Sequence, residues 1–119
     1  MHINDVEAFV QTSNIDSVIV CLSAFLGLLT ADEPLISERY IYRNEKASVV
    51  IQESQDGYLS IWLKGTLPWN SCTELGRHLA MSLKCPVRCD PESEFPEIDS
   101  YSDVFLQIDA AQEQLVIWG

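Results

Sequence analysis

The chain has 119 residues, of which 18 are acidic and 7 are basic, so its formal net charge is −11. This length fits a single domain over residues 1–119, and an apolar fraction of 47% supplies enough side chains for a core, which excludes wholesale disorder. An acidic surface repels phosphate backbones, so nucleic acid is excluded as the main partner. The charge is also uneven, because residues 89–119 carry eight acidic side chains and no Lys or Arg.

Two helices are predicted near the start of the chain. Residues 3–12 are expected to form a short helix, capped by Asn4 and with acidic side chains in its first turn. A Ser-x-x-Asp capping box at residues 13–16 introduces the second helix, whose apolar side chains recur at helical spacing over residues 15–29. The β-branched run at residues 18–20 leaves a strand as the alternative for this second element.

Three strands are predicted in the middle of the chain. Residues 39–43, 48–53 and 58–64 show strand-like composition or alternation, and turn residues separate them. The second turn contains the Asp56-Gly57 pair that is typical of hairpins. The three segments therefore predict an antiparallel meander.

The remaining elements alternate between helix and strand. A Ser-x-x-Glu capping box at residues 71–74 predicts another amphipathic helix, which ends before Pro86. Residues 87–89 are expected as a short edge strand, and residues 104–108 and 115–118 as the last two strands.

The order α-α-β-β-β-α-(β)-β-β predicts an α+β fold. A single antiparallel sheet of about five strands has two to three helices packed largely on one face. Such a sheet leaves its other face partly open. If aromatic side chains lie there beside basic ones, they form a binding surface, and a wholly internal aromatic set is the alternative. The aromatic residues concerned are Tyr40, Tyr42, Tyr58, Trp62 and Trp118.

Most of the C-terminal charge lies in residues 90–103, here called the acidic segment, where two prolines indicate a loop. Large apolar side chains recur within it at Phe95, Ile98 and Tyr101. They either anchor in a partner whose approach the carboxylates steer, or pin the loop onto its own core. The predicted partner-binding residues are Asp90, Glu92, Glu94, Phe95, Glu97, Asp99, Tyr101 and Asp103.

No motif in the chain indicates an enzyme, a metal site or a cofactor. The glycines are scattered, so no phosphate-binding loop is predicted. Cys85 and Cys89 lack further ligands at zinc spacing, and His78 is expected as a solvated side chain on a helix surface. The longest apolar stretch is too short to span a bilayer, and no basic segment precedes it. A cytoplasmic protein without membrane partners is therefore expected.

These observations favour a non-catalytic protein that docks a basic protein partner. In size, charge and architecture the chain is similar to immunity proteins and antitoxins, whose acidic faces fill the basic clefts of nucleases.

It also resembles secretion chaperones, which are small, acidic α+β proteins with a helix, three strands, a helix and two strands. That resemblance implies a homodimer that escorts another protein. A small ligand-binding domain or enzyme with an aromatic-lined pocket is the remaining alternative.

Overall fold

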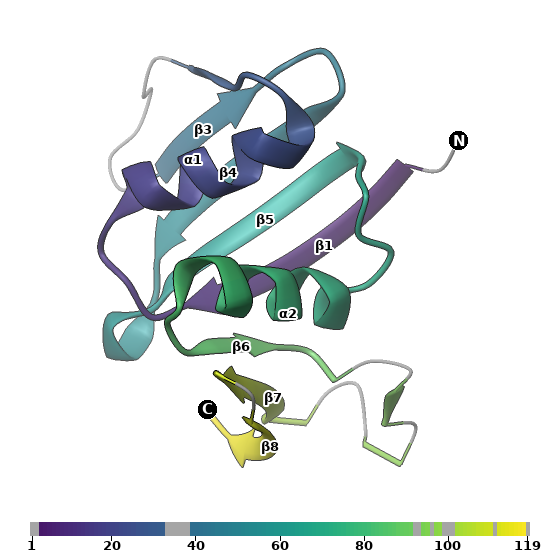
Figure 1. The fold of residues 1–119 in the computed structure, drawn as a ribbon. Helices are drawn as coiled ribbons and strands as arrows, with labels where there is room; N and C mark the ends of the chain where they lie inside the picture. Colours follow the sequence, from purple (N-terminus) through teal and green to yellow (C-terminus); the bar gives the residue numbers. More distant parts are fainter. Residues whose placement is uncertain are drawn as a thin grey trace.

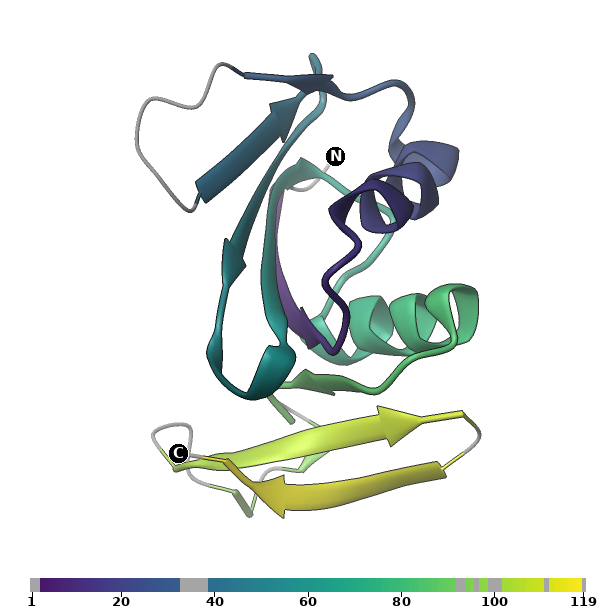
Figure 2. The ribbon, with the colours of Figure 1, turned by 90° about the vertical axis from the view of Figure 1, so that its left-hand side faces the viewer.

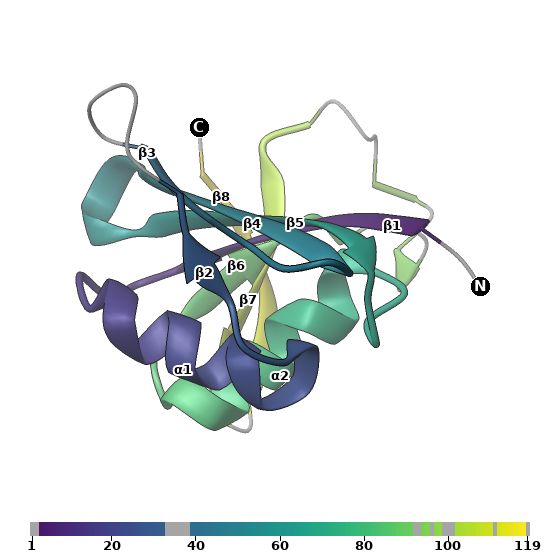
Figure 3. The same ribbon diagram turned by 90° about the horizontal axis from the view of Figure 1, so that it is seen from above.

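The computed structural model describes residues 3–32, 39–91, 94–95, 97–98, 102–110 and 112–118. Along the chain the elements are β1 (Ile3–Val10), α1 (Ile15–Leu26), β2 (Thr30–Ala31), β3 (Arg39–Arg43), β4 (Ala47–Glu53), a 3₁₀ turn (Gln55–Gly57), β5 (Leu59–Thr66), α2 (Cys72–Leu83), β6 (Val87–Cys89), β7 (Val104–Asp109) and β8 (Gln112–Ile117). In this part of the chain, eight strands form one antiparallel sheet in the order β2-β3-β4-β5-β1-β6-β7-β8. Both helices lie on the same face of the sheet (Figure 1, Figure 3).

The centre of the sheet has a split β-α-β arrangement. The strands β4, β5, β1 and β6 are neighbours in that order, and α1 and α2 lie between them in the chain. Strands β2 and β3 extend one margin, and the β7–β8 hairpin extends the other. Figure 2 shows this hairpin at the bottom of the molecule, below α2. The C-terminal third is thereby placed beside α2.

The helix predicted for residues 3–12 is wrong, because residues 3–10 form β1. Burial alternates along this strand: Val6, Ala8 and Val10 are buried, whereas Asp5 and Glu7 are exposed. Each residue of β1 has a partner on β5, and its last two residues also pair with β6. A helix would keep Val6 and Val10 on one face but turn Ala8 to the opposite side.

The sheet has eight strands rather than about five, and the described chain has two helices rather than two to three. The strands that sequence patterns missed are β1 and the two-residue β2. The helix predicted over residues 15–29 is confirmed for Ile15–Leu26 and ends earlier, at Gly27. Asn14 and not Ser13 caps α1, since its side chain accepts the Ser17 N–H at 3.1 Å. The cap predicted for α2 is confirmed, because Ser71 Oγ accepts the Glu74 N–H at 3.1 Å.

Aromatic side chains divide between the two faces of the sheet. The register pairs Tyr40 and Tyr42 with Ile51 and Val49, which belong to the core, so these tyrosines lie on the helix side. Tyr58 and Trp118 are buried and pack against each other, with ring centroids 5.0 Å apart. A single exposed set of all five aromatics therefore does not form.

No helix of the described chain has the length and apolar character needed to cross a bilayer.

Gly65 allows β4 and β5 to approach closely. Its φ is +138°, and a Cβ at this position would clash with the carbonyl oxygen of Lys46. Gly57 also has a positive φ, but nothing lies near its missing Cβ.

We therefore expect Gly65→Ala to lower the free energy of unfolding by about 3 kcal/mol. The matched variant Gly57→Ala should lose only about 1–2 kcal/mol, because backbone strain acts there without a clash. Urea unfolding followed by circular dichroism measures both. Equal losses in the two variants would contradict the close approach at Gly65.

Candidate functional site

The acidic segment connects β6 to β7 and passes beside the first half of α2. Of the eight predicted site residues, the structure describes Asp90, Glu94, Phe95, Glu97 and Asp103. The other three, Glu92, Asp99 and Tyr101, lie outside the described residues.

Glu94 fastens the acidic segment to α2. Its carboxylate accepts a hydrogen bond from the hydroxyl of the buried Thr73, and two from the Arg77 guanidinium at 2.8 and 2.9 Å. The hydrogen bonds from Arg77 and Thr73 lower the pKa of Glu94, because they favour its charged form.

Arg77 connects the acidic segment to the β7–β8 hairpin as well. Its Nε and Nη2 donate to the Glu113 carboxylate at 2.8 and 3.0 Å, so one guanidinium binds two carboxylates in bidentate geometry. Hydrogen bonds to Glu113 and Glu94 raise the pKa of Arg77 further above its ordinary value. Three segments that are distant in sequence therefore meet at one cation.

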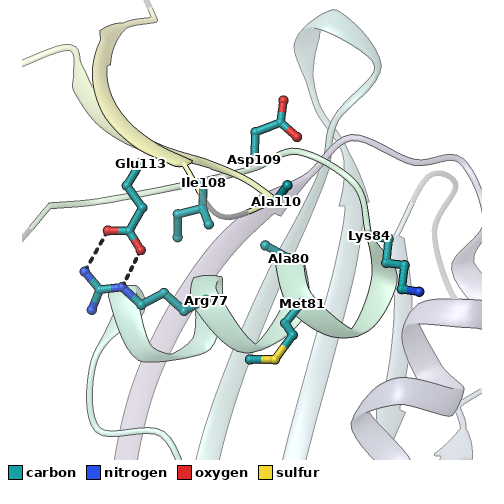
Figure 4. Close-up of a pocket in the computed structure, with 8 residues that line it drawn as sticks. All are labelled: Arg77, Ala80, Met81, Lys84, Ile108, Asp109, Ala110 and Glu113. Carbon is teal, nitrogen blue, oxygen red and sulfur yellow. Dashed lines mark hydrogen bonds and ion pairs between the residues drawn. The ribbon is translucent and has the colours of Figure 1, made fainter.

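A pocket of about 600 Å³ opens beside this ion pair, between α2 and the hairpin. Figure 4 shows Arg77 and Glu113 facing each other at one end of the pocket and Lys84 at the other. Ala80 and Met81 supply its apolar α2 side, and the hairpin side consists of Ile108, Asp109, Ala110 and Glu113. Met81 is 73% exposed, so an apolar contact is open to solvent there.

The predicted anchor Phe95 is half-buried and packs against the protein's own core. Its carbonyl oxygen accepts the Ile98 N–H at 2.9 Å, which closes a turn in the segment. This part of the acidic segment is therefore pinned to the fold, as one of the two sequence-based interpretations expects. Whether the segment also docks a partner stays a prediction.

Several carboxylates at this end of the molecule remain exposed. Glu97 and Asp103 in the segment and Asp109 in the hairpin are all exposed, and none has an ion pair within the described residues. Arg77 is already committed to two carboxylates. Arg88 is held over the rings of Tyr58 and Trp118, 4.9 Å from each centroid. Lys84, at the far end of the pocket, has no ion pair among the described residues, so exposed carboxylates outnumber such lysines here by three to one.

The cysteines and His78 do not form an activated pair. The nearest thiol to His78 is not Cys85 or Cys89 but Cys21, whose sulfur lies 3.7 Å from Nε2. Burial raises the pKa of Cys21 and lowers the pKa of His78, so the neutral forms of both are favoured. The His78 ring also packs edge-on against Phe25 at 4.4 Å, so it is part of the helix packing rather than a solvated side chain. No group of three or more potential ligands is arranged to hold a metal in the described chain.

Sequence reasoning missed Thr73, Arg77 and Glu113. Thr73, Arg77, Ala80 and Lys84 recur at spacings of three and four, and this repeat marks one face of α2. That spacing could have identified this face of α2 from the sequence. The partners of Arg77 lie 17 and 36 residues away, and no local pattern connects them.

Comparison with protein-family models, with curated proteins and with solved structures finds no match for this chain.

Glu94→Gln is expected to destabilise the protein at neutral pH and not in acid. Because the folded-state pKa of Glu94 is lowered, its ion pair stabilises the fold above the ordinary glutamate range and loses this effect as the pH falls through the lowered value. The side chain is 39% exposed, so the loss at pH 7 should be about 1 kcal/mol or less. Urea unfolding at a series of pH values measures this difference.

Glu45→Gln is the matched control, because Glu45 is exposed and has no ion pair among the described residues. Its stability should follow the wild type at every pH. A Glu94→Gln profile parallel to the wild type would contradict the role of the Arg77 ion pair.

Proposed function

We propose that the protein binds a basic protein partner through the acidic segment and the adjoining β7–β8 hairpin, and blocks it as immunity proteins and antitoxins do. The single observation that carries this proposal is the set of exposed, unpaired carboxylates at Glu97, Asp103 and Asp109, beside an Arg77 that is already neutralised. A basic protein is the partner class that such a surface attracts.

The pocket between α2 and the hairpin supports the same partner class. Ala80, Met81 and Ile108 give it apolar walls, and on the hairpin side Glu113 is paired with Arg77 whereas the exposed Asp109 carboxylate has no ion pair among the described residues. Lys84 lines the end away from Arg77. A lysine or arginine from the partner suits this combination, since its methylene stem packs on apolar walls and its charged head meets a carboxylate.

The anchoring of the segment lowers the cost of binding. Glu94 is fixed by Arg77 and Thr73, and Phe95 packs on the core, so part of the surface is already ordered before a partner arrives. Less conformational entropy is lost on association when a binding loop is ordered in advance.

The two alternatives have less support in the structure. The chaperone order resembles the run from α1 to β7, with β2 as an extra strand, but β1 precedes α1 and lies between β5 and β6, where that order has no counterpart. The alternative expects an aromatic-lined pocket on the sheet. The described lining beside Arg77 is aliphatic or charged, and two other pockets include a single aromatic residue each, Phe25 in one and Tyr58 in the other. The geometry therefore favours the partner-binding proposal.

Reversing exposed carboxylates of the segment should weaken partner binding without unfolding the protein. The test variant is Glu97→Lys with Asp103→Lys, which leaves the Glu94 anchor intact. The control variant is Asp16→Lys with Glu45→Lys, which makes the same change in charge at exposed positions in α1 and the β3–β4 turn. Each protein serves as bait for the source-cell lysate at about 50 mM and about 500 mM salt.

A basic protein that is retained stoichiometrically by the wild type and the control, lost from the test variant and eluted by salt is the expected result. With that protein purified, the wild type should inhibit its activity, and the test variant should associate at least about tenfold more slowly at low salt. If no protein is retained at either salt, or if both variants retain it equally, the proposal is wrong.

A further inference from the structure

Strand β8 forms an open margin of the sheet. It pairs only with β7 among the described strands, and Figures 1 and 2 show no element beyond it. The backbone N–H of Trp118 donates to the backbone carbonyl of Asp103 at 2.8 Å. This bond fixes which residues of β8 direct their backbone groups toward β7 and which direct them outward. By this alternation, Gln114 and Val116 bond to β7, whereas the N–H and C=O groups of residues 113, 115 and 117 point outward.

This margin lacks the features that usually protect an edge strand. It is six residues long and contains no proline or lysine. Its one charged residue, Glu113, is neutralised by Arg77. Leu115 is 39% exposed and Ile117 is 84% exposed, so the outward-bonding residues are also apolar.

The opposite margin of the sheet is protected by comparison. Strand β2 has only two residues, and the Asp32 that follows it pairs with Arg43 of β3 at 2.7 Å. Short edges with charges beside them offer little template for another strand. The two margins therefore differ, and β8 is the one suited to pairing.

We propose that β8 pairs with β8 of a second copy of this chain, antiparallel and around a two-fold axis at Leu115. In this register Leu115 lies opposite its own counterpart, and Glu113 lies opposite Ile117 of the second copy. Every outward N–H and C=O of the three residues then finds a partner, and the two sheets become continuous. The apolar side chains of the two copies meet on the helix side of the joined sheet.

The self-complementary register is the reason for choosing a second copy. The outward residues along β8 are Glu113, Leu115 and Ile117. A two-fold axis at Leu115 therefore places the two Leu115 side chains against each other at the centre. Each Glu113 keeps its ion pair with Arg77 of its own chain. A basic partner would gain nothing at this margin, because the one carboxylate is already paired. Salt should strengthen this dimer, because it screens the repulsion between two chains of charge −11. Salt should instead weaken the binding of a basic protein.

Charge pairs at position 115 test both the dimer and its register. Sedimentation velocity at about 50 mM and about 500 mM salt is applied to the wild type, Leu115→Glu, Leu115→Lys and an equimolar mixture of the two variants. Leu28→Glu is the control, because Leu28 is 85% exposed and lies outside the hairpin. Circular dichroism establishes that each variant is folded.

The wild type and Leu28→Glu should sediment as dimers, more completely at high salt. Each charged variant should dissociate at least tenfold more readily, because like charges face each other across the two-fold. The mixture should recover the dimer, since Glu then faces Lys.

A wild type that stays monomeric at both salts would overturn the proposal. A dimer that Leu28→Glu disrupts while the Leu115 variants do not would place the interface elsewhere. Dissociation of both charged variants without recovery in the mixture would refute the register. Leu115 belongs to the hairpin, but none of these variants changes Glu97, Asp103 or Asp109, the carboxylates that carry the partner-binding proposal, so the charge-reversal variants test that proposal separately.

Discussion

The structure depends on the pairing of β1 inside the sheet. This strand runs beside β5 over its whole length and meets β6 at Phe9 and Val10, so it joins the half of the sheet that contains β2 to β5 to the half that contains β6 to β8. Because the contact with β6 is short, two further groups hold the halves together. Helix α2 packs on β1, β6 and β7 from one side, and on the other side Phe9 packs edge-on against both Phe105 and Trp118.

The candidate site depends on this connection between the two halves of the sheet. Once the hairpin is held beside α2, Arg77 forms ion pairs with carboxylates of both the acidic segment and β8, so its positive charge is balanced within the protein. The remaining carboxylates face solvent, so their negative charge stays exposed. A protein with net charge −11 would otherwise lose stability through repulsion in this region, so the Arg77 ion pairs give order to the segment and leave its outer surface acidic.

Sequence patterns predicted the elements that local signals control. The bounds of β3 and β6 and the Ser71 cap of α2 agree with the structure because alternation, turn residues and capping are local properties. Strand β1 was missed because Asn4, Asp5 and Glu7 also satisfy the rules for a helix start, and only pairing with β5, 49 to 63 residues away, decides between the two. The acidic segment was recognised from composition, but the Arg77 pairs that hold it depend on tertiary contacts.

Hydrogen exchange measured residue by residue in the native protein tests the central position of β1 most directly. The β1 amides bonded to β5 should exchange only through global unfolding, at the same rate as the slowest amides of β5. Rapid exchange over residues 3–10 while β4 and β5 remain protected would show that β1 is not an integral strand. The arrangement of α2, the hairpin and the acidic segment would then lose its physical basis.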